Sequence, residues 1–187
     1  MDIPNIVYVV ACIFLLLLFI PRTTAKAKRH KRYIKQSKEI RDTLLSFKGK
    51  NRNARIVSHL KGINPYIFEE LCLTSLKDGL GFKVKRSKSY SGDGGCDGVV
   101  YLGFPFLNRK KWLIQAKCYS DYIKPQHVKE FSDLVDRNNC KGLFIHTAKT
   151  GDKSKAMKSS NVKIISGSLL ARMILGTTNT FEITGRR

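Results

Sequence analysis

Hydrophobic and polar positions change their period several times along the chain, and these changes predict a succession of short elements after residue 62. Apolar residues recur at helical spacing over residues 65–78. Asn64 followed by Pro65 is typical of a helix start, because the asparagine accepts from unpaired amides and proline suits the first helical position. Further amphipathic stretches predict helices at 125–135, 152–158 and 169–175, and alternating or apolar runs predict strands at 82–85, 99–102, 111–117, 142–147 and 162–165.

The order of these elements, α-β-β-β-α-β-α-β-α, indicates an α/β fold. Consecutive strands joined by turns pair antiparallel, whereas strands joined through a helix pair in parallel. The pattern therefore predicts one mixed β-sheet flanked by helices over residues 62–176, with a short tail at 177–187. No internal repeat is found in the sequence.

The first residues of the chain have a different character. The stretch 3–20 has no charged residue and is long enough to cross a hydrocarbon layer of about 30 Å. No basic residue precedes it and a dense basic cluster follows, which favours a retained transmembrane helix at 1–21 over a cleaved signal peptide. The same cluster places the remainder on the cytoplasmic side. We therefore expect a single-pass membrane protein whose N-terminal helix contacts the lipid bilayer.

Charge narrows the choice of partners. The 187 residues include 35 Lys and Arg but only 14 Asp and Glu, a net charge of +21 that favours polyanions as partners. About half of this excess lies in the basic juxtamembrane segment, residues 22–61. That segment suits either anionic lipid or nucleic-acid phosphates. The five cysteines are scattered without a C-x-x-C pair, which favours reduced thiols over a disulfide framework or a zinc site.

Polar residues interrupt the strand predicted at 111–117. A period of two puts Gln115 and Lys117 on one face, and hairpin pairing brings Asp97 close to Gln115. The Asp97 carboxylate, the Gln115 amide oxygen and the Ala116 carbonyl are hard oxygen ligands that suit Mg²⁺. Lys117 would then orient or deprotonate an attacking water and offset charge on a phosphate. Each residue alone also has a structural interpretation. Asp97 suits a turn aspartate, Gln115 an amide on an edge strand and Lys117 a solvated strand end.

The helix predicted at 65–78 supplies a further candidate. At 100° per residue Glu69 borders the apolar face centred on Phe68 and Cys72, whereas Glu70 is predicted to point to solvent. A carboxylate turned inward needs a partner, which a metal or Lys117 would provide. Glu69 is therefore the site candidate of the two.

Other side chains are weaker candidates. His127 and His146 could act as general bases, although single histidines are usually structural residues. Tyr119 suits either a DNA contact or the sheet edge. A group of lysines within residues 149–158 suits either backbone phosphates or a solvated helix face.

Taken together, these motifs resemble a known enzyme family. The sequence contains a compound pattern that is more specific than any of its parts: a glutamate on a helix, a glycine-rich loop and a strand that ends in Gln-x-Lys. It resembles the catalytic domain of Mrr-type restriction endonucleases, a branch of the PD-(D/E)XK nuclease superfamily in which Gln-x-Lys replaces acidic-x-Lys. The matching runs are Phe68-Glu69-Glu70-Leu71, Leu80-Gly81-Phe82, Gly92-Asp93-Gly94-Gly95-Cys96-Asp97-Gly98 and Ile114-Gln115-Ala116-Lys117-Cys118-Tyr119.

The resemblance implies a restriction-endonuclease-like fold and a role for each matching residue. Asp97 would bind the metal with Gln115 beside it, Lys117 would be the catalytic lysine and Glu69 the helix glutamate. The implied activity is a restriction-like DNA endonuclease that depends on Mg²⁺ or Mn²⁺. The resemblance does not extend to the anchor, which the apolar stretch 3–20 alone predicts, and the sequence leaves open whether a homodimer forms to cut both strands. The basic segment motivates an alternative, a catalytically silent membrane-bound DNA tether on a nuclease scaffold. A lipid-binding regulatory protein is a third hypothesis.

Overall fold

The computed structural model describes residues 25–87, 95–102 and 110–185. The chain divides into two units, Met1–Arg32 and Tyr33–Arg187. The sheet and all contacts discussed below belong to the second unit.

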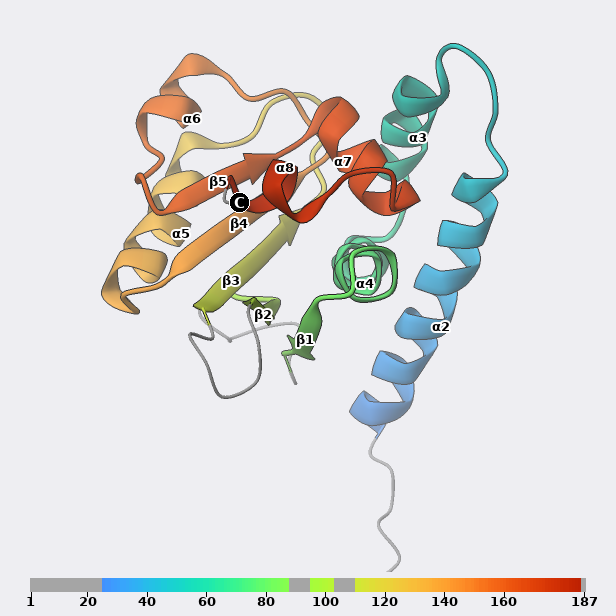
Figure 1. The fold of residues 1–187 in the computed structure, drawn as a ribbon, viewed down its shortest axis with the longest axis horizontal. Coiled ribbons are helices and arrows are strands. Elements are labelled where there is room, and N and C mark those ends of the chain that lie inside the picture. The colour runs from blue at the N-terminus through green and yellow to red at the C-terminus, as the bar shows by residue number, and fades with distance from the viewer. Residues whose placement is uncertain (1–24, 88–94, 103–109, 186–187) are drawn as a thin grey trace, which may run out of the picture. The chain divides into compact units, whose positions relative to one another are not determined.

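The order of elements from residue 65 to residue 175 is the predicted one, and a further short helix follows within the residues predicted as a tail (Figure 1). The described elements are α2 (Ala25–Leu45), α3 (Arg52–Lys61), α4 (Pro65–Thr74), the π-helix η1 (Ser75–Gly79), β1 (Lys83–Arg86), β2 (Gly98–Leu102), β3 (Lys110–Lys117), α5 (Pro125–Arg137), β4 (Lys141–His146), α6 (Asp152–Ala156), β5 (Val162–Ile165), α7 (Gly167–Leu175) and α8 (Thr180–Thr184). Helix α4 starts as expected, with the Asn64 side chain accepting from the Tyr66 amide and Pro65 in the first turn.

The five strands form one mixed sheet in the order β1-β2-β3-β4-β5. Strands β1, β2 and β3 pair antiparallel, and β3, β4 and β5 pair in parallel. Helices α5 and α6 lie in the two parallel crossovers, where connections of this kind require them. The predicted mixed sheet flanked by helices is therefore confirmed.

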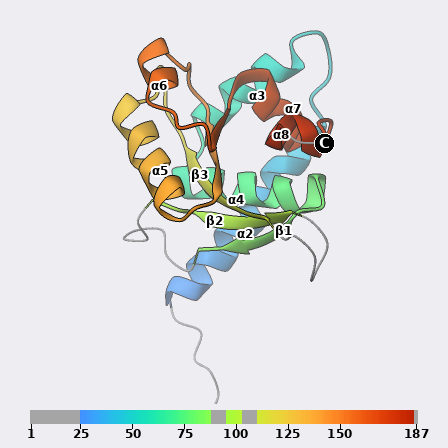
Figure 2. The same cartoon turned by 60° about the vertical axis from the view of Figure 1, so that its left-hand side comes forward.

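Helices cover both faces of the sheet. Phe68, Ile114 and Leu143 belong to the core between the sheet and α3, α4 and α7, whereas Phe131 and Phe144 belong to the core beneath α5. Figure 2 shows α5 and α6 on one side of the sheet and α4 and α7 on the other. The central strands β3 and β4 are consequently buried on both faces.

The larger core also includes residues from the basic segment. Leu44 of α2 and Ile56 and Leu60 of α3 are fully buried. The Ser37 and Thr74 hydroxyls lie 3.2 Å apart, which joins the second half of α2 to α4. The apolar residues of the basic segment are thus part of the hydrophobic core of the domain.

The predicted single-pass membrane localisation, with the nuclease domain on the cytoplasmic side, is corrected here. Within the described ranges, no helix is both long and apolar enough to cross a bilayer. Helix α2 has 21 residues, but lysine and arginine occur throughout its first half, and each costs about 3 kcal/mol at the centre of a bilayer. The anchor predicted at 1–21 lies outside the described residues.

The solvent-exposed position predicted for Glu70 is also wrong. Glu70 is 2% exposed, and its Oε2 accepts from Arg86 Nε at 2.7 Å, while Arg86 also donates to Thr74. The solvent position predicted for Glu70 assumed one buried face of α4. Because α2 packs against α4 as well, a second face of the helix is buried, and Arg86 of β1 reaches the carboxylate there.

His146 is a polar side chain buried at the end of β4. Its Nε2 lies 3.0 Å from the Thr150 hydroxyl. Burial lowers the pKa of His146 to about 4, against a smaller opposing effect of the Ala148 backbone. The ring is therefore a weak base, and it is fully buried, which favours the structural interpretation over a general base.

Removing the buried carboxylate should destabilise the fold. We expect Glu70→Ala to lower the free energy of unfolding in urea by roughly 3–5 kcal/mol, because it leaves the Arg86 charge buried without its counterion. Glu39→Ala is the matched control, since Glu39 pairs with Lys35 at 3.7 Å with both side chains largely exposed, and should cost less than about 0.5 kcal/mol. Equal losses in the two variants would contradict a buried ion pair.

Acid should destabilise the protein through His146. Its pKa is about 4 in the folded state and about 6.5 when unfolded, so only the unfolded chain gains this proton between those values. Stability should therefore fall as the pH falls from 6.5 to 4, by roughly 2–3 kcal/mol from this group. His146→Gln should flatten the dependence measured by urea unfolding. The exposed His59 is the control, and a profile unchanged in His146→Gln would refute the assignment.

Candidate active site

Asp97 is held against β3 by two hydrogen bonds. Its amide donates to the Ile114 carbonyl at 2.8 Å, which extends the β2–β3 ladder by one residue beyond the pair Gly98 and Ile114. Its Oδ2 accepts from the Ala116 amide at 2.6 Å. The carboxylate therefore lies beside the part of β3 that carries Gln115 and Lys117, where hairpin pairing was expected to bring it.

Gln115 brings a second oxygen to the same place. The side chain is 6% exposed, and among the described residues its Oε1 has no hydrogen-bond partner. Gly95 approaches so closely that an added Cβ would lie 2.9 Å from Gln115 Nε2, and the φ of Gly95 is +82°. A buried amide oxygen left unpaired costs about 1–3 kcal/mol. This oxygen can thus still accept from a donor or bind a cation that the described residues do not supply.

Lys117 ends β3 next to this pair of oxygens. It is half-buried and lies opposite His146 in the parallel register. Strand alternation puts it on the Gln115 face, the one that α5 covers. Burial lowers the pKa of His127 on α5, and the nearby Lys117 ammonium lowers it further. His127 therefore faces the lysine as a neutral ring.

Glu69 lies on α4, the helix that packs on the Ile114 and Ala116 face of β3, and its carboxylate influences two cysteine thiols. The Glu69 side chain is partly buried. Burial raises the pKa of Cys118 to about 12, and Glu69 adds to the rise. Burial also raises the pKa of Cys72 well above its usual value, with further contributions from Cys118, Asp97 and Glu69. The carboxylates of Asp97 and Glu69 thus both disfavour the thiolate form of Cys72.

The donors at this site are mostly not the common metal-binding side chains. No group of three or more His, Cys, Asp and Glu residues suited to a metal ion occurs in the described part of the chain. The structure instead brings together one carboxylate, an amide oxygen and the backbone of Ala116. These are oxygen donors of the kind that Mg²⁺ accepts. The unpaired Gln115 oxygen beside Asp97 fits such a cation.

Two residues beside the site received little weight from the sequence. Tyr119 hydrogen-bonds through its hydroxyl to His127 Nδ1 at 2.5 Å. Its backbone is pinned by Thr147, whose hydroxyl donates to the Tyr119 carbonyl and accepts from its amide. The segment after Lys117 is therefore fixed to the segment after β4. The signal in the sequence was the position of Tyr119, two residues beyond Lys117 on the same face.

Comparison with known proteins agrees with this fold. The family model Mrr_cat, described as restriction endonuclease, matches residues 60–174. The structure of restriction endonuclease FokI bound to DNA matches with a TM-score of 0.51 and 12% identity over 88% of this chain. A second FokI structure matches with a TM-score of 0.47 and 13% identity, also over 88%.

The likeness to FokI shows a shared fold, and this chain covers 33% of the FokI chain. No curated protein matches the chain. The family model, however, covers more than half of the sequence, including Glu69, Asp97 and the Gln-x-Lys strand. The chain therefore belongs to the restriction endonuclease family with the Mrr-type catalytic domain.

Proposed function

We propose that this protein is a divalent-metal-dependent endonuclease that hydrolyses phosphodiester bonds of DNA. Membership of the family supports the reaction class. The observation that carries the proposal is the Asp97 carboxylate, fixed on the Ala116 amide beside the unpaired oxygen of Gln115. A half-buried carboxylate, a buried amide and a lysine near the end of β3 suit this reaction.

Asp97, Gln115 and the Ala116 carbonyl would hold the cation, Mg²⁺ or Mn²⁺. When bound, such an ion supplies stabilisation of negative charge on the phosphate and lowers the pKa of a bound water. The protein prepares for this by fixing one carboxylate oxygen through a backbone donor. Fixed donors need little reorganisation during the reaction, which is the main advantage of such a site.

Lys117 is the group proposed to meet the substrate. Hydrolysis forms a bond from a water oxygen to phosphorus and breaks the bond from phosphorus to the leaving sugar oxygen. An ammonium at the end of β3 offsets the charge that grows on the phosphate oxygens and orients the attacking water. Burial keeps His127 neutral on the α5 side, so Lys117 and not His127 provides the positive charge there. Glu69 is proposed as the second carboxylate near the site.

Substituting the carboxylate tests the proposal directly. Asp97→Asn keeps an oxygen for the Ala116 amide but removes the charge, so the fold should persist while plasmid cleavage in Mg²⁺ or Mn²⁺ falls about 100-fold or more. EDTA should stop cleavage by the wild-type protein, and added cation should restore it. The exposed Asp133→Asn is the matched control. Metal-independent cutting, or full activity of Asp97→Asn, would overturn the proposal.

A lysine substitution separates chemistry from DNA binding. Lys117→Met keeps the aliphatic stem and should lower the single-turnover cleavage rate about 100- to 1,000-fold, because the charge at the phosphate is lost. DNA affinity, measured by fluorescence anisotropy in EDTA, should change by less than about fivefold, since one phosphate contact is removed. Lys83→Met, on the edge strand β1, is the control. DNA binding by the wild-type protein without cleavage in any divalent cation would instead support a catalytically silent DNA-binding protein.

A further inference from the structure

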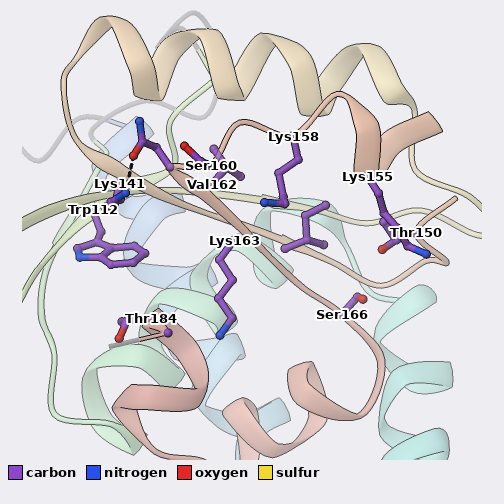
Figure 3. A pocket seen from close by; sticks show the side chains of 13 residues that line it. Trp112, Lys141, Thr150, Lys155, Lys158, Ser160, Val162, Lys163, Ser166 and Thr184 are labelled. Atoms are coloured by element: carbon purple, nitrogen blue, oxygen red, sulfur yellow. Dashed lines mark hydrogen bonds between the residues drawn. The ribbon is translucent and has the colours of Figure 1, made fainter. Parts of the chain in front are cut away.

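A basic groove runs along β5, the edge strand of the sheet farthest from β1. It has a volume of about 580 Å³ and is lined by 13 residues (Figure 3). None of these described lining residues is acidic, and four are lysines: Lys141, Lys155, Lys158 and Lys163. We call this hollow the β5 groove. Its hydroxyl-bearing lining residues add further hydrogen-bond donors.

The lysine ammonium groups of the β5 groove donate hydrogen bonds mainly to uncharged acceptors. Lys141 donates to the Asn161 amide oxygen, Lys163 to the Glu182 backbone carbonyl, and Lys158 to the Ser159 carbonyl at 3.2 Å. Lys155 pairs with Asp152 at 3.0 Å, but both side chains are largely exposed. Such a surface pair contributes little. The contacts thus orient the lysines without neutralising them.

Nearby carboxylates are occupied outside the groove. Glu182 binds Arg172 at 2.8 Å and Thr178, and Asp136 accepts from Asn161 and Ser159. Burial lowers the pKa of Lys163, an effect that Glu182 partly opposes. An anion bound in the groove would therefore favour the charged form of Lys163. It would also be attracted by the positive charge of the groove lysines, which the neighbouring carboxylates do not neutralise.

The lining suits phosphates better than nucleobases. Base recognition on a protein surface usually relies on accessible aromatic rings. The aromatic ring that lines this groove, Trp112, is only 2% exposed and belongs to the core. Ammonium groups and hydroxyls remain, and these bind backbone phosphates without reading sequence.

The position of the groove relates it to the candidate active site. Lys117 lies opposite His146, and the β4–β5 register places Ile145 opposite Ile165, so Ser166 is level with Lys117 two strands away. At about 4.8 Å per strand this is a separation of about 10 Å. From Asn161 to Ser166 the strand extends about 17 Å. That length corresponds to about five base-pair steps along the axis of a DNA duplex, at 3.4 Å per step.

We propose that the β5 groove is a second DNA-binding surface, which holds backbone phosphates beside the phosphate that is cut. The inference rests on the proposed function for its ligand, DNA, but requires no catalysis. Lysines on an edge strand also protect it from pairing with other chains. If the lysines only prevented the edge strand from pairing with other chains, they would not contribute to DNA affinity. A measurement of DNA affinity therefore separates the two roles.

A double substitution in the full-length chain tests the groove. Lys158→Ala with Lys163→Ala should weaken binding to a fluorescent 30-base-pair duplex in EDTA about tenfold at low salt, and should reduce the slope of log Kd against log salt by about 1–2, because one to two phosphate contacts are lost. The control is Lys77→Ala with Lys83→Ala, which removes two exposed lysines near β1. The control should keep the wild-type slope.

A second measurement needs no substitution. Acetylation of the wild-type protein, read by mass spectrometry, should slow severalfold at Lys158 and Lys163 when the duplex is present and remain unchanged at Lys83. This readout decides the question if loss of the Lys163 contact with Glu182 impairs folding, which thermal unfolding would reveal.

The outcomes separate the two proposals. Wild-type affinity and slope in the groove variant, together with no protection of its lysines, would overturn the groove while leaving metal-dependent cleavage intact. Reduced affinity and protection in a protein that never cuts DNA would support the groove and refute the nuclease.

Discussion

The candidate site depends on one charge-assisted hydrogen bond, from the Ala116 amide to the Asp97 carboxylate at 2.6 Å. It ties the residue that precedes β2 to the central strand β3. Bonds to an ionised acceptor are about twice as strong as neutral ones. Because Ala116 lies between Gln115 and Lys117, this contact places a carboxylate, an amide oxygen and an ammonium within one short stretch of strand. The proposed chemistry needs that placement.

The mixed sheet makes this placement rigid. Strand β3 pairs antiparallel with β2, which brings Asp97 across a hairpin, and in parallel with β4, which sets His146 opposite Lys117. An added Cβ at Gly142 would lie only 2.5 Å from Val135 Cγ2, so α5 packs directly on β4. The functional side chains therefore project from the most constrained strand of the protein.

Local patterns were sufficient for the order of elements and for the approach of Asp97 to β3, because strand period, turn residues and hairpin geometry are encoded nearby in sequence. They failed where burial depends on distant packing. Glu70 appeared exposed because nothing near it in sequence shows that α2 covers α4 or that Arg86 reaches back from β1. The sequence pointed to the lysines within residues 149–158 but not to Lys141 and Lys163, because these two join the β5 groove only through the sheet.

The amide at position 115 has a physical consequence for a metal-dependent enzyme. A carboxylate only 6% exposed and close to Asp97 would place two like charges in the interior, which costs several kcal/mol per ion unless a cation is always present. An unpaired amide oxygen costs only about 1–3 kcal/mol. In the proposed nuclease, Gln115 would let the protein fold before it binds a cation, at the expense of a weaker site. Substrate phosphate would then be needed to strengthen cation binding, which would couple it to DNA binding.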